Sequence, residues 1–212
     1  MNTFELIVPC HFGLEAVMKK EILDLGYEVS QVEDGRVTFI GDAEAICRAN
    51  IFLRTTERVL LKVGSFHAET FEDLFQGTRA IPWEEYLPKD AKFWVAKASS
   101  IKSKLFSPSD IQSIMKKAMV ERMKKAYGIE WFPENGASFP LRVFLHKDTV
   151  TVALDTTGES LHKLILCSCW QRITATNLLI FLHFDEELVY TAHIACLYIA
   201  IQQGEYVLER MW

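Results

Sequence analysis

Side chains that can bind phosphate groups concentrate in one basic, serine-rich segment, 97–107, and in the helix that we expect after it. Ammonium groups form ion pairs with phosphates, hydroxyl groups form hydrogen bonds with them, and a helix start adds a positive dipole. The candidate binding residues are Lys97, Ser99, Ser100, Lys102, Ser103, Lys104, Ser107, Lys116 and Lys117. The chemistry they offer is capture of a polyanion. The alternative is a solvated basic loop followed by a solvated helix face.

The charge of the chain is strongly segregated. The 212 residues carry a formal net charge of −5, yet residues 92–125 hold nine bases and two acids and have a net charge of +7. The distribution of charge in a sequence indicates which partners a protein binds, not which fold it has. A basic block in an otherwise acidic chain favours nucleic acid as the partner. A helix that simply exposes its lysines to solvent is again the alternative.

The composition excludes several classes of protein. Half of the residues are hydrophobic and 12% are aromatic, which is enough apolar surface for a folded core and excludes a disordered chain. No apolar run reaches the roughly 18–20 residues that cross a bilayer. The first ten residues lack the basic start of a signal peptide. Five cysteines without framework spacing suit a reducing compartment, so we expect a cytoplasmic protein without a membrane segment.

No group of residues predicts a metal site or a catalytic nucleophile. Cys167 and Cys169 with His162 lack the fourth ligand and the spacing of a structural zinc site. Cys10 and His11 are neighbours near the end of a predicted strand, so their side chains point to opposite faces and cannot act as nucleophile and base. The sequence therefore predicts no metal and no catalytic residue in this chain.

The first part of the chain alternates strand and helix patterns. The predicted elements follow in the order 4–8 (strand), 13–25 (helix), 29–32 and 37–40 (strands), 42–54 (helix) and 59–63 (strand). Asp34 and Gly35 between the two middle strands indicate a hairpin. This order is the ferredoxin-like arrangement, and we place it at residues 1–66.

A second α/β unit is predicted at 67–158. Its elements are expected at 69–80 (helix), 81–88 (broken helix), 93–96 (strand), 97–107 (loop), 110–127 (helix), and 141–145 and 150–154 (hairpin). Ser109 and Gln112 match a capping box at the start of the long helix. Trp83, Trp94 and Trp131 are expected to be partly buried core residues rather than platforms for base stacking. Together the two units predict an α+β fold.

The composition changes after Lys163. Residues 164–212 contain no Lys and no Pro, and they hold three of the five cysteines. Their pattern favours helices near 173–184 and 187–203. We expect residues 159–212 to form a linker and a divergent apolar tail.

Five segments are similar, in the same order, to the N-terminal part of one bacterial enzyme family. They are 9–15 (PCHFGLE), 52–59 (FLRTTERV), 81–83 (IPW), 98–107 (ASSIKSKLFS) and 154–163 (LDTTGESLHK). Over residues 3–163 the chain resembles the THUMP-containing, class I S-adenosylmethionine-dependent guanine-N2 methyltransferases of large-subunit ribosomal RNA (RlmL-like). The resemblance implies a ferredoxin-like subdomain, a THUMP-like RNA-binding domain and RNA contact by the 98–107 segment.

The resemblance ends at Lys163. The family continues with Arg-Gly-Tyr-Arg into a Rossmann-like catalytic domain, whereas Leu164 and Ile165 follow here. The sequence contains neither a Gly-x-Gly cofactor loop nor the Asn-Pro-Pro-Tyr type of catalytic motif. The resemblance thus implies an RNA-binding part whose catalytic domain is missing or replaced, as in a truncated or frame-shifted gene. It implies no S-adenosylmethionine site in this chain and no activity of the chain alone.

Two other functions stay open at this point. The chain could be a free-standing THUMP-type RNA-binding module without catalysis, or a protein-interaction domain whose apolar tail docks a partner. The expected partner of the family member is large-subunit ribosomal RNA, and that of the free-standing module is RNA. Salt-dependent RNA binding distinguishes both from the protein-interaction domain.

Overall fold

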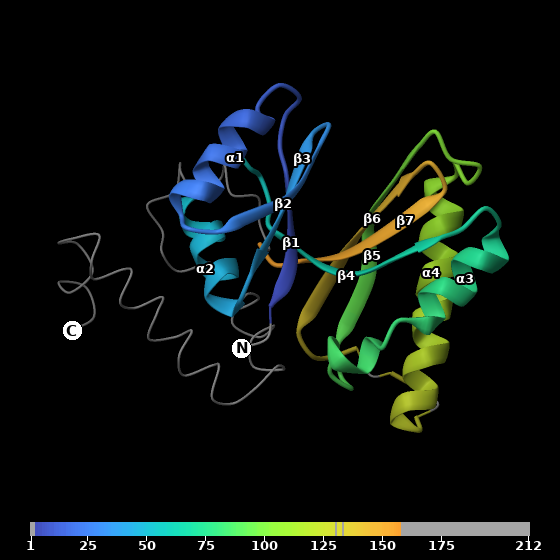
Figure 1. Ribbon diagram of the computed structural model, residues 1–212. Coiled ribbons are helices and arrows are strands. Elements are labelled where there is room, and N and C mark those ends of the chain that lie inside the picture. The colour runs from blue at the N-terminus through green and yellow to red at the C-terminus, as the bar shows by residue number, and fades with distance from the viewer. Residues whose placement is uncertain (1–2, 130, 133, 158–212) are drawn as a thin grey trace, which may run out of the picture.

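The computed structural model describes residues 3–129, 131–132 and 134–157 (Figure 1). Its elements are β1 (Phe4–Pro9), α1 (Glu15–Asp24), β2 (Glu28–Glu33), β3 (Arg36–Gly41), α2 (Ala43–Phe52), β4 (Leu60–His67), α3 (Phe71–Ala80), the 3-10 helix η1 (Trp83–Glu85), β5 (Lys92–Ile101), α4 (Pro108–Tyr127), β6 (Ser138–His146) and β7 (Thr149–Asp155). The strands form one seven-stranded sheet in the order β2-β3-β1-β4-β7-β6-β5. The predicted α+β class is confirmed.

The first half of the sheet has the predicted ferredoxin-like order of elements, from β1 to β4. Strand β1 lies between β3 and β4 and is antiparallel to both. The β2–β3 hairpin turns at Asp34 and Gly35, where the φ of Gly35 is 75°, a value that favours glycine. Helix α2 begins where the Asp42 carboxylate accepts a hydrogen bond from the Ala45 N–H at 2.9 Å. Local turn and cap signals therefore place these elements as the sequence predicts.

Strand β4 joins the two halves of the sheet. It pairs with β1 at Leu60 and Leu61, and with β7 along its whole length to His67. Strands β6 and β7 form the predicted hairpin, and β5 runs parallel to β6 at the edge of the sheet. The predicted boundary between residues 66 and 67 falls at the end of β4 and stays a prediction.

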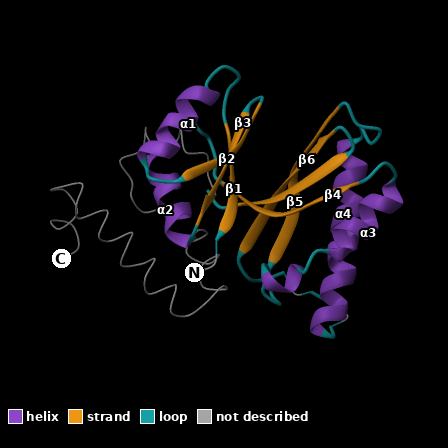
Figure 2. Ribbon diagram, in the orientation of Figure 1, coloured by secondary structure: helices purple, strands orange, loops and turns teal. Residues whose placement is uncertain are grey.

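The helices lie on the outer side of a bent sheet. Figure 2 shows α1 and α2 outside the half that contains β1 to β3, and α3 and α4 outside the other half. Strand residues that face these helices, such as Leu6 and Leu141, belong to one continuous buried core. The inner face carries a small apolar group formed by Ile7, Leu60 and Ala153 with Phe144. Within the described residues no helix covers that inner face.

The connection from β5 to α4 differs from the prediction. The sequence predicts a loop from residue 97, whereas β5 continues to Ile101, because its residues pair with β6 as far as His146. Ala98 has a low strand propensity, so the partner strand and not the local sequence decides the conformation here. The loop of the basic segment therefore covers only residues 102–107.

The start of the long helix is also corrected. Helix α4 begins at Pro108, with Ser107 at the N-cap position, and the predicted capping box at Ser109 is not formed. A proline suits the first helical turn because its missing N–H group would have no partner there. The helix ends at Tyr127 as predicted, and Gly128 follows in the left-handed conformation with a φ of 63°.

The three tryptophans of the second half differ in exposure. Trp83 is fully buried, with its indole N–H donating to the Thr78 carbonyl oxygen at 2.7 Å, whereas Trp94 is 38% exposed and is not a core residue. Trp131 is 84% exposed, so the prediction of a core position is wrong for both Trp94 and Trp131. The next residue, Phe132, occupies the core position instead and packs edge-on against Phe93.

The predictions for the end of the chain lie outside the described residues. These are the helices near 173–184 and 187–203 and the Cys167, Cys169 and His162 group.

Candidate nucleic-acid interface

Three connections meet at one end of the second half of the sheet, and we call this region the tip. They are the 102–107 loop, the β6–β7 turn at Lys147 and Asp148, and Ala68, which follows β4. The Lys147 N–H donates to the Ile101 carbonyl oxygen at 3.2 Å. The Asp148 carboxylate accepts a hydrogen bond from the Lys104 N–H at 2.7 Å, and the Asp148 N–H donates to Ser103 Oγ at 3.0 Å. The tip is therefore one fastened unit rather than three separate loops.

The β6–β7 turn suits this role because of its backbone conformation. Lys147 and Asp148 both have positive φ values, 51° and 59°, which is the geometry of a tight two-residue hairpin turn. Lys102 also has a positive φ, 52°, where the chain leaves β5. Lys102 and Lys147 are both exposed, so the tip presents two ammonium groups to solvent.

Strand alternation separates the predicted binding residues of β5. Lys97 pairs with Arg142, and Ser99 with Phe144, so both belong to the inner, helix-free face. Ser100 belongs to the opposite face, where its hydroxyl group donates to the Leu105 carbonyl oxygen under the loop. Lys97 is exposed and can reach a ligand on the inner face, whereas the Ser100 hydroxyl is engaged within the protein.

The other predicted serines serve mainly local structure. Ser103 Oγ donates to the Ile101 carbonyl oxygen at 3.2 Å, in addition to accepting from Asp148. Ser107 lies at the N-cap of α4, and its Oγ is 3.2 Å from that of Ser109. Their contact with RNA stays a prediction.

Lys104 already forms an ion pair with an acidic side chain in this structure. Its ammonium group forms an ion pair with Glu69, whose carboxylate also lies 3.3 Å from His67 Nε2. The hydrogen bond from Lys104 lowers the pKa of Glu69, and the same contact raises the pKa of Lys104. A phosphate that binds Lys104 must therefore displace a carboxylate.

Lys116 and Lys117 lie away from the tip, on α4. The Lys116 ammonium group donates to the Phe93 carbonyl oxygen at 2.5 Å and to Glu134 Oε1 at 2.7 Å, near the start of β5. Lys117 lies over the Phe75 ring of α3 at 5.8 Å. The structure does not bring these two lysines together with Lys102, and their contact with RNA stays a prediction.

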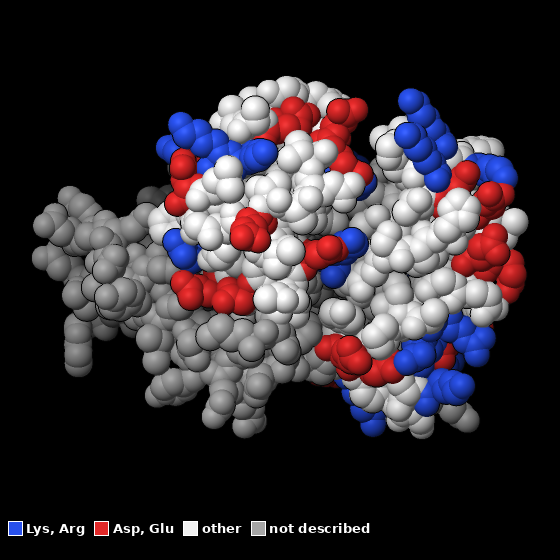
Figure 3. All heavy atoms as spheres, viewed as in Figure 1, with Lys and Arg blue, Asp and Glu red and all other residues white. Residues whose placement is uncertain are grey.

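Acids accompany many of the bases in the window 92–125. Three of its bases form ion pairs: Lys104 with Glu69, Lys116 with Glu134, and Arg122 with Glu84. Figure 3 shows the same mixture of basic and acidic side chains over the half that contains α3 and α4. The charge of +7 in the sequence therefore overstates the field that a ligand meets.

Four residues at or next to the tip are absent from the candidate binding residues named from the sequence, although two of them, Ile101 and Phe106, lie within the 98–107 segment. His146 ends β6 and Lys147 begins the β6–β7 turn, and only the pairing of β5 with β6 brings them beside Ile101. Ile101 and Phe106 are 56% and 82% exposed, although both are large and apolar. An exposed aromatic side chain beside lysines is the usual arrangement for stacking an unpaired base. Phe106 could have been noticed from its place inside the basic segment.

A buried polar network joins the end of β7 to the first half. Asp155 is 1% exposed, and its carboxylate accepts from Arg58 Nη1 at 2.7 Å and lies 3.3 Å from Arg142 Nε. Burial lowers the pKa of Arg142 from its ordinary value, although Asp155 acts in the opposite direction. Such a cluster favours one arrangement of the elements that contribute to it.

Two threonines continue this network toward α2. Thr157 donates to Asn50 Oδ1 at 2.7 Å and accepts from the Val59 N–H at 2.8 Å. Thr156 donates to the Val59 carbonyl oxygen at 2.7 Å. These bonds connect residues about a hundred positions apart in the sequence and fix the two halves of the sheet relative to each other.

Two negative findings concern the described residues. No group of three or more His, Cys, Asp or Glu side chains among them could hold a metal ion. None of the helices in that part of the chain is long and apolar enough to cross a membrane.

Comparison with known families gives two matches that follow the two halves of the sheet. Residues 5–60 match the RlmL ferredoxin-like domain, and residues 68–155 match the THUMP domain. A Bacillus subtilis (strain 168) protein named "Putative RNA methyltransferase YpsC" is 46% identical over 165 residues, which cover 77% of this chain and 42% of that protein. The chain thus spans less than half the length of this relative.

Two solved structures share the fold at substantial identity. A possible methylase from Clostridium difficile 630 is 42% identical, with a TM-score of 0.77 over 87% of this chain and 49% of that one. "SMU.472, a putative methyltransferase complexed with SAH" is 32% identical, with a TM-score of 0.76 over 99% of this chain and 67% of that one. The two family matches and these relatives point to the same family as the five segments identified in the sequence. The chain belongs to the family of THUMP-containing methyltransferases, whose RlmL-type ferredoxin-like domain and THUMP domain it carries.

Proposed function

We propose that this chain captures RNA for a methyltransferase that modifies a guanine N2 of large-subunit ribosomal RNA in the cytoplasm. The observation that carries the proposal is the tip, a fastened part of a THUMP domain that exposes Lys102, Lys147 and the aromatic ring of Phe106. Lysines can bind the phosphates of RNA and an aromatic ring can stack on an unpaired base, which together suit an irregular RNA segment better than a regular duplex.

Methyl transfer itself requires groups that these 212 residues do not supply. S-adenosylmethionine provides the methyl group when it is bound. A glycine-rich turn lets the protein backbone approach the methionine end of this cofactor closely. The sequence has no Gly-x-Gly, so its residues do not fit this cofactor. We propose that the chain binds and orients RNA, and that a catalytic domain outside this sequence would transfer the methyl group.

The test is binding of labelled large-subunit ribosomal RNA fragments to the full chain across a range of salt concentrations. If about four phosphates are contacted, the logarithm of affinity should fall with the logarithm of salt concentration at a slope of about −0.7 per phosphate. Lys102→Ala with Lys147→Ala should reduce the affinity at least about tenfold and lower the steepness of the slope, since two phosphate contacts are lost.

The matched control is Lys19→Ala with Lys20→Ala, which removes the same charge from the exposed surface of α1. An equal loss of affinity in the control would show that only net charge matters. Absence of salt-dependent binding by the wild-type chain would refute the proposal. Incorporation of methyl groups from S-adenosylmethionine by this chain alone would refute the part that concerns catalysis.

A further inference from the structure

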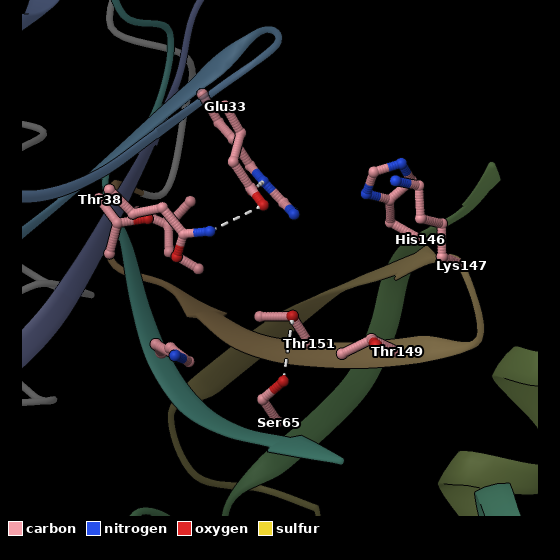
Figure 4. Close-up of a pocket in the computed structure, with 11 residues that line it drawn as sticks. Glu33, Thr38, Ser65, His146, Lys147, Thr149 and Thr151 are labelled. Carbon is pink, nitrogen blue, oxygen red and sulfur yellow. Dashed lines mark hydrogen bonds and ion pairs between the residues drawn. The ribbon is translucent and has the colours of Figure 1, made fainter. Parts of the chain in front are cut away.

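A cleft opens on the inner face of the sheet, between the two halves. It has a volume of about 360 Å³, near the lower end for sites that bind small groups. Figure 4 shows Glu33 reaching in from the β2–β3 hairpin, His146 from the opposite side, and Ser65, Thr149 and Thr151 on the strands between them. Both halves of the molecule therefore contribute walls to one cleft.

The cleft is positively charged and rich in hydroxyl groups. Its lining includes three cations, one carboxylate and four hydroxyl side chains: Arg36, Lys62 and Lys147; Glu33; Thr38, Ser65, Thr149 and Thr151. Cations can bind phosphates, while Ser and Thr hydroxyls can exchange hydrogen bonds with the 2′-hydroxyl groups that distinguish RNA from DNA. This chemistry suits a ribonucleotide.

The cleft is continuous with the tip. His146 and Lys147 line it, and the Lys147 N–H is bonded to the Ile101 carbonyl oxygen beside Lys102. At the opposite wall, the Arg36 guanidinium lies 5.3 Å from the centre of the Phe144 ring, which brings β3 within contact distance of β6. A strand of RNA held at the tip would thus find its next phosphate positions along the cleft.

We propose that the ferredoxin-like half takes part directly in binding, and that an unpaired RNA strand runs from the tip into this cleft, placing about one nucleotide between Lys62 and Lys147. This inference rests on the proposed function. In the free protein Arg36 is paired with Glu33 and Lys62 with Glu5. Phosphate groups replace these carboxylates when RNA binds. A volume of about 360 Å³ suits one nucleotide of a single strand.

The test uses the full chain with two fluorescent RNA probes, an unpaired uridine 10-mer and a duplex of the same length. Lys62→Gln should weaken binding of the 10-mer about three- to tenfold and reduce the steepness of its salt slope by about 0.7, the value for one phosphate. Glu5→Gln should tighten it about twofold, because the exposed carboxylate that competes for Lys62 loses its charge. The control Lys20→Gln removes one positive charge from exposed α1 and should leave the affinity nearly unchanged.

Crosslinking then locates the strand. A 4-thiouridine 10-mer should give crosslinked peptides from β4 or β3 as well as from the β6–β7 turn. If tip variants weaken binding while Lys62→Gln and Glu5→Gln match the control, and crosslinks come only from the tip, the proposed function stands and the cleft inference is wrong. Tighter binding of the duplex than of the unpaired 10-mer also contradicts the cleft inference. If the wild-type chain binds no RNA, both proposals fail.

Discussion

Asp155→Asn should destabilise the protein more than any single change at the exposed tip. The substitution keeps the shape of the side chain but removes a buried negative charge that faces Arg58 at 2.7 Å and Arg142 at 3.3 Å. The two guanidinium groups then repel each other with no carboxylate between them. The Thr157 N–H, which donates to Asp155 Oδ1 at 3.1 Å, can still bond to the amide oxygen.

The magnitude follows from the burial of the three side chains. Removing one partner of a fully buried ion pair costs about 3–5 kcal/mol. The Arg58 and Arg142 side chains are 17% and 20% exposed, so some water reaches them and the expected cost is reduced. We expect a loss of about 2–4 kcal/mol in the free energy of unfolding. For a chain of this size that corresponds to a Tm lower by about 5–15 °C.

Urea unfolding followed by tryptophan fluorescence and far-ultraviolet circular dichroism measures this change. Asp24→Asn is the matched control, because Asp24 is exposed at the end of α1 and its replacement should stay within about 0.5 kcal/mol. A cost below about 1 kcal/mol for Asp155→Asn would refute the argument, since it would place the cluster in the range of surface ion pairs.

Three further changes test other parts of the structure. Glu69→Gln should tighten RNA binding, because Lys104 then has no competing carboxylate. Since that contact lowers the pKa of Glu69, the ion pair should persist below the usual carboxylate range and be lost only as the pH falls through the lowered value, as a carboxyl NMR titration can measure. Phe106→Ala should weaken binding of unpaired RNA about fivefold or more, through lost stacking, and leave the urea midpoint unchanged because Phe106 is 82% exposed. Gly77→Ala should lower the urea midpoint even though alanine favours helices, because its Cβ would come 2.3 Å from the Phe66 ring.

The order of elements was predictable because its signals are local. Asp34 and Gly35 mark the β2–β3 turn, and the alternation of apolar residues on both sides of Lys147 and Asp148 marks the last hairpin. The limits of β5 were not predictable in this way. Its last residues are strand because β6 lies beside them, and that pairing connects positions more than forty residues apart.

The candidate site was predictable only in part for the same reason. A basic segment is visible in a sequence, and Lys102 and Lys104 were found there. What the sequence could not indicate is which lysine is already paired with an acid, because Glu69 is 35 positions from Lys104. Nor could it place Lys147 beside Lys102, since the turn meets the end of β5 and the loop through hydrogen bonds between positions more than forty residues apart.

Asp148 separates simple electrostatics from the fastening of the tip, because the two predict opposite results. Its carboxylate holds the Lys104 N–H at 2.7 Å, and its carbonyl oxygen accepts from the Ala68 N–H at 2.8 Å. Asp148→Gly tolerates the positive φ of 59°, removes the carboxylate and raises the net charge by one. If net charge governs RNA binding, this variant binds more tightly. If the fastened arrangement governs it, binding weakens about threefold or more, while Asp148→Asn, which keeps an acceptor oxygen and also tolerates the turn, binds as well as the wild type or better. Fluorescence anisotropy with the same unpaired RNA decides between them, and tighter binding by the glycine variant would show that the lysines act as independent charges.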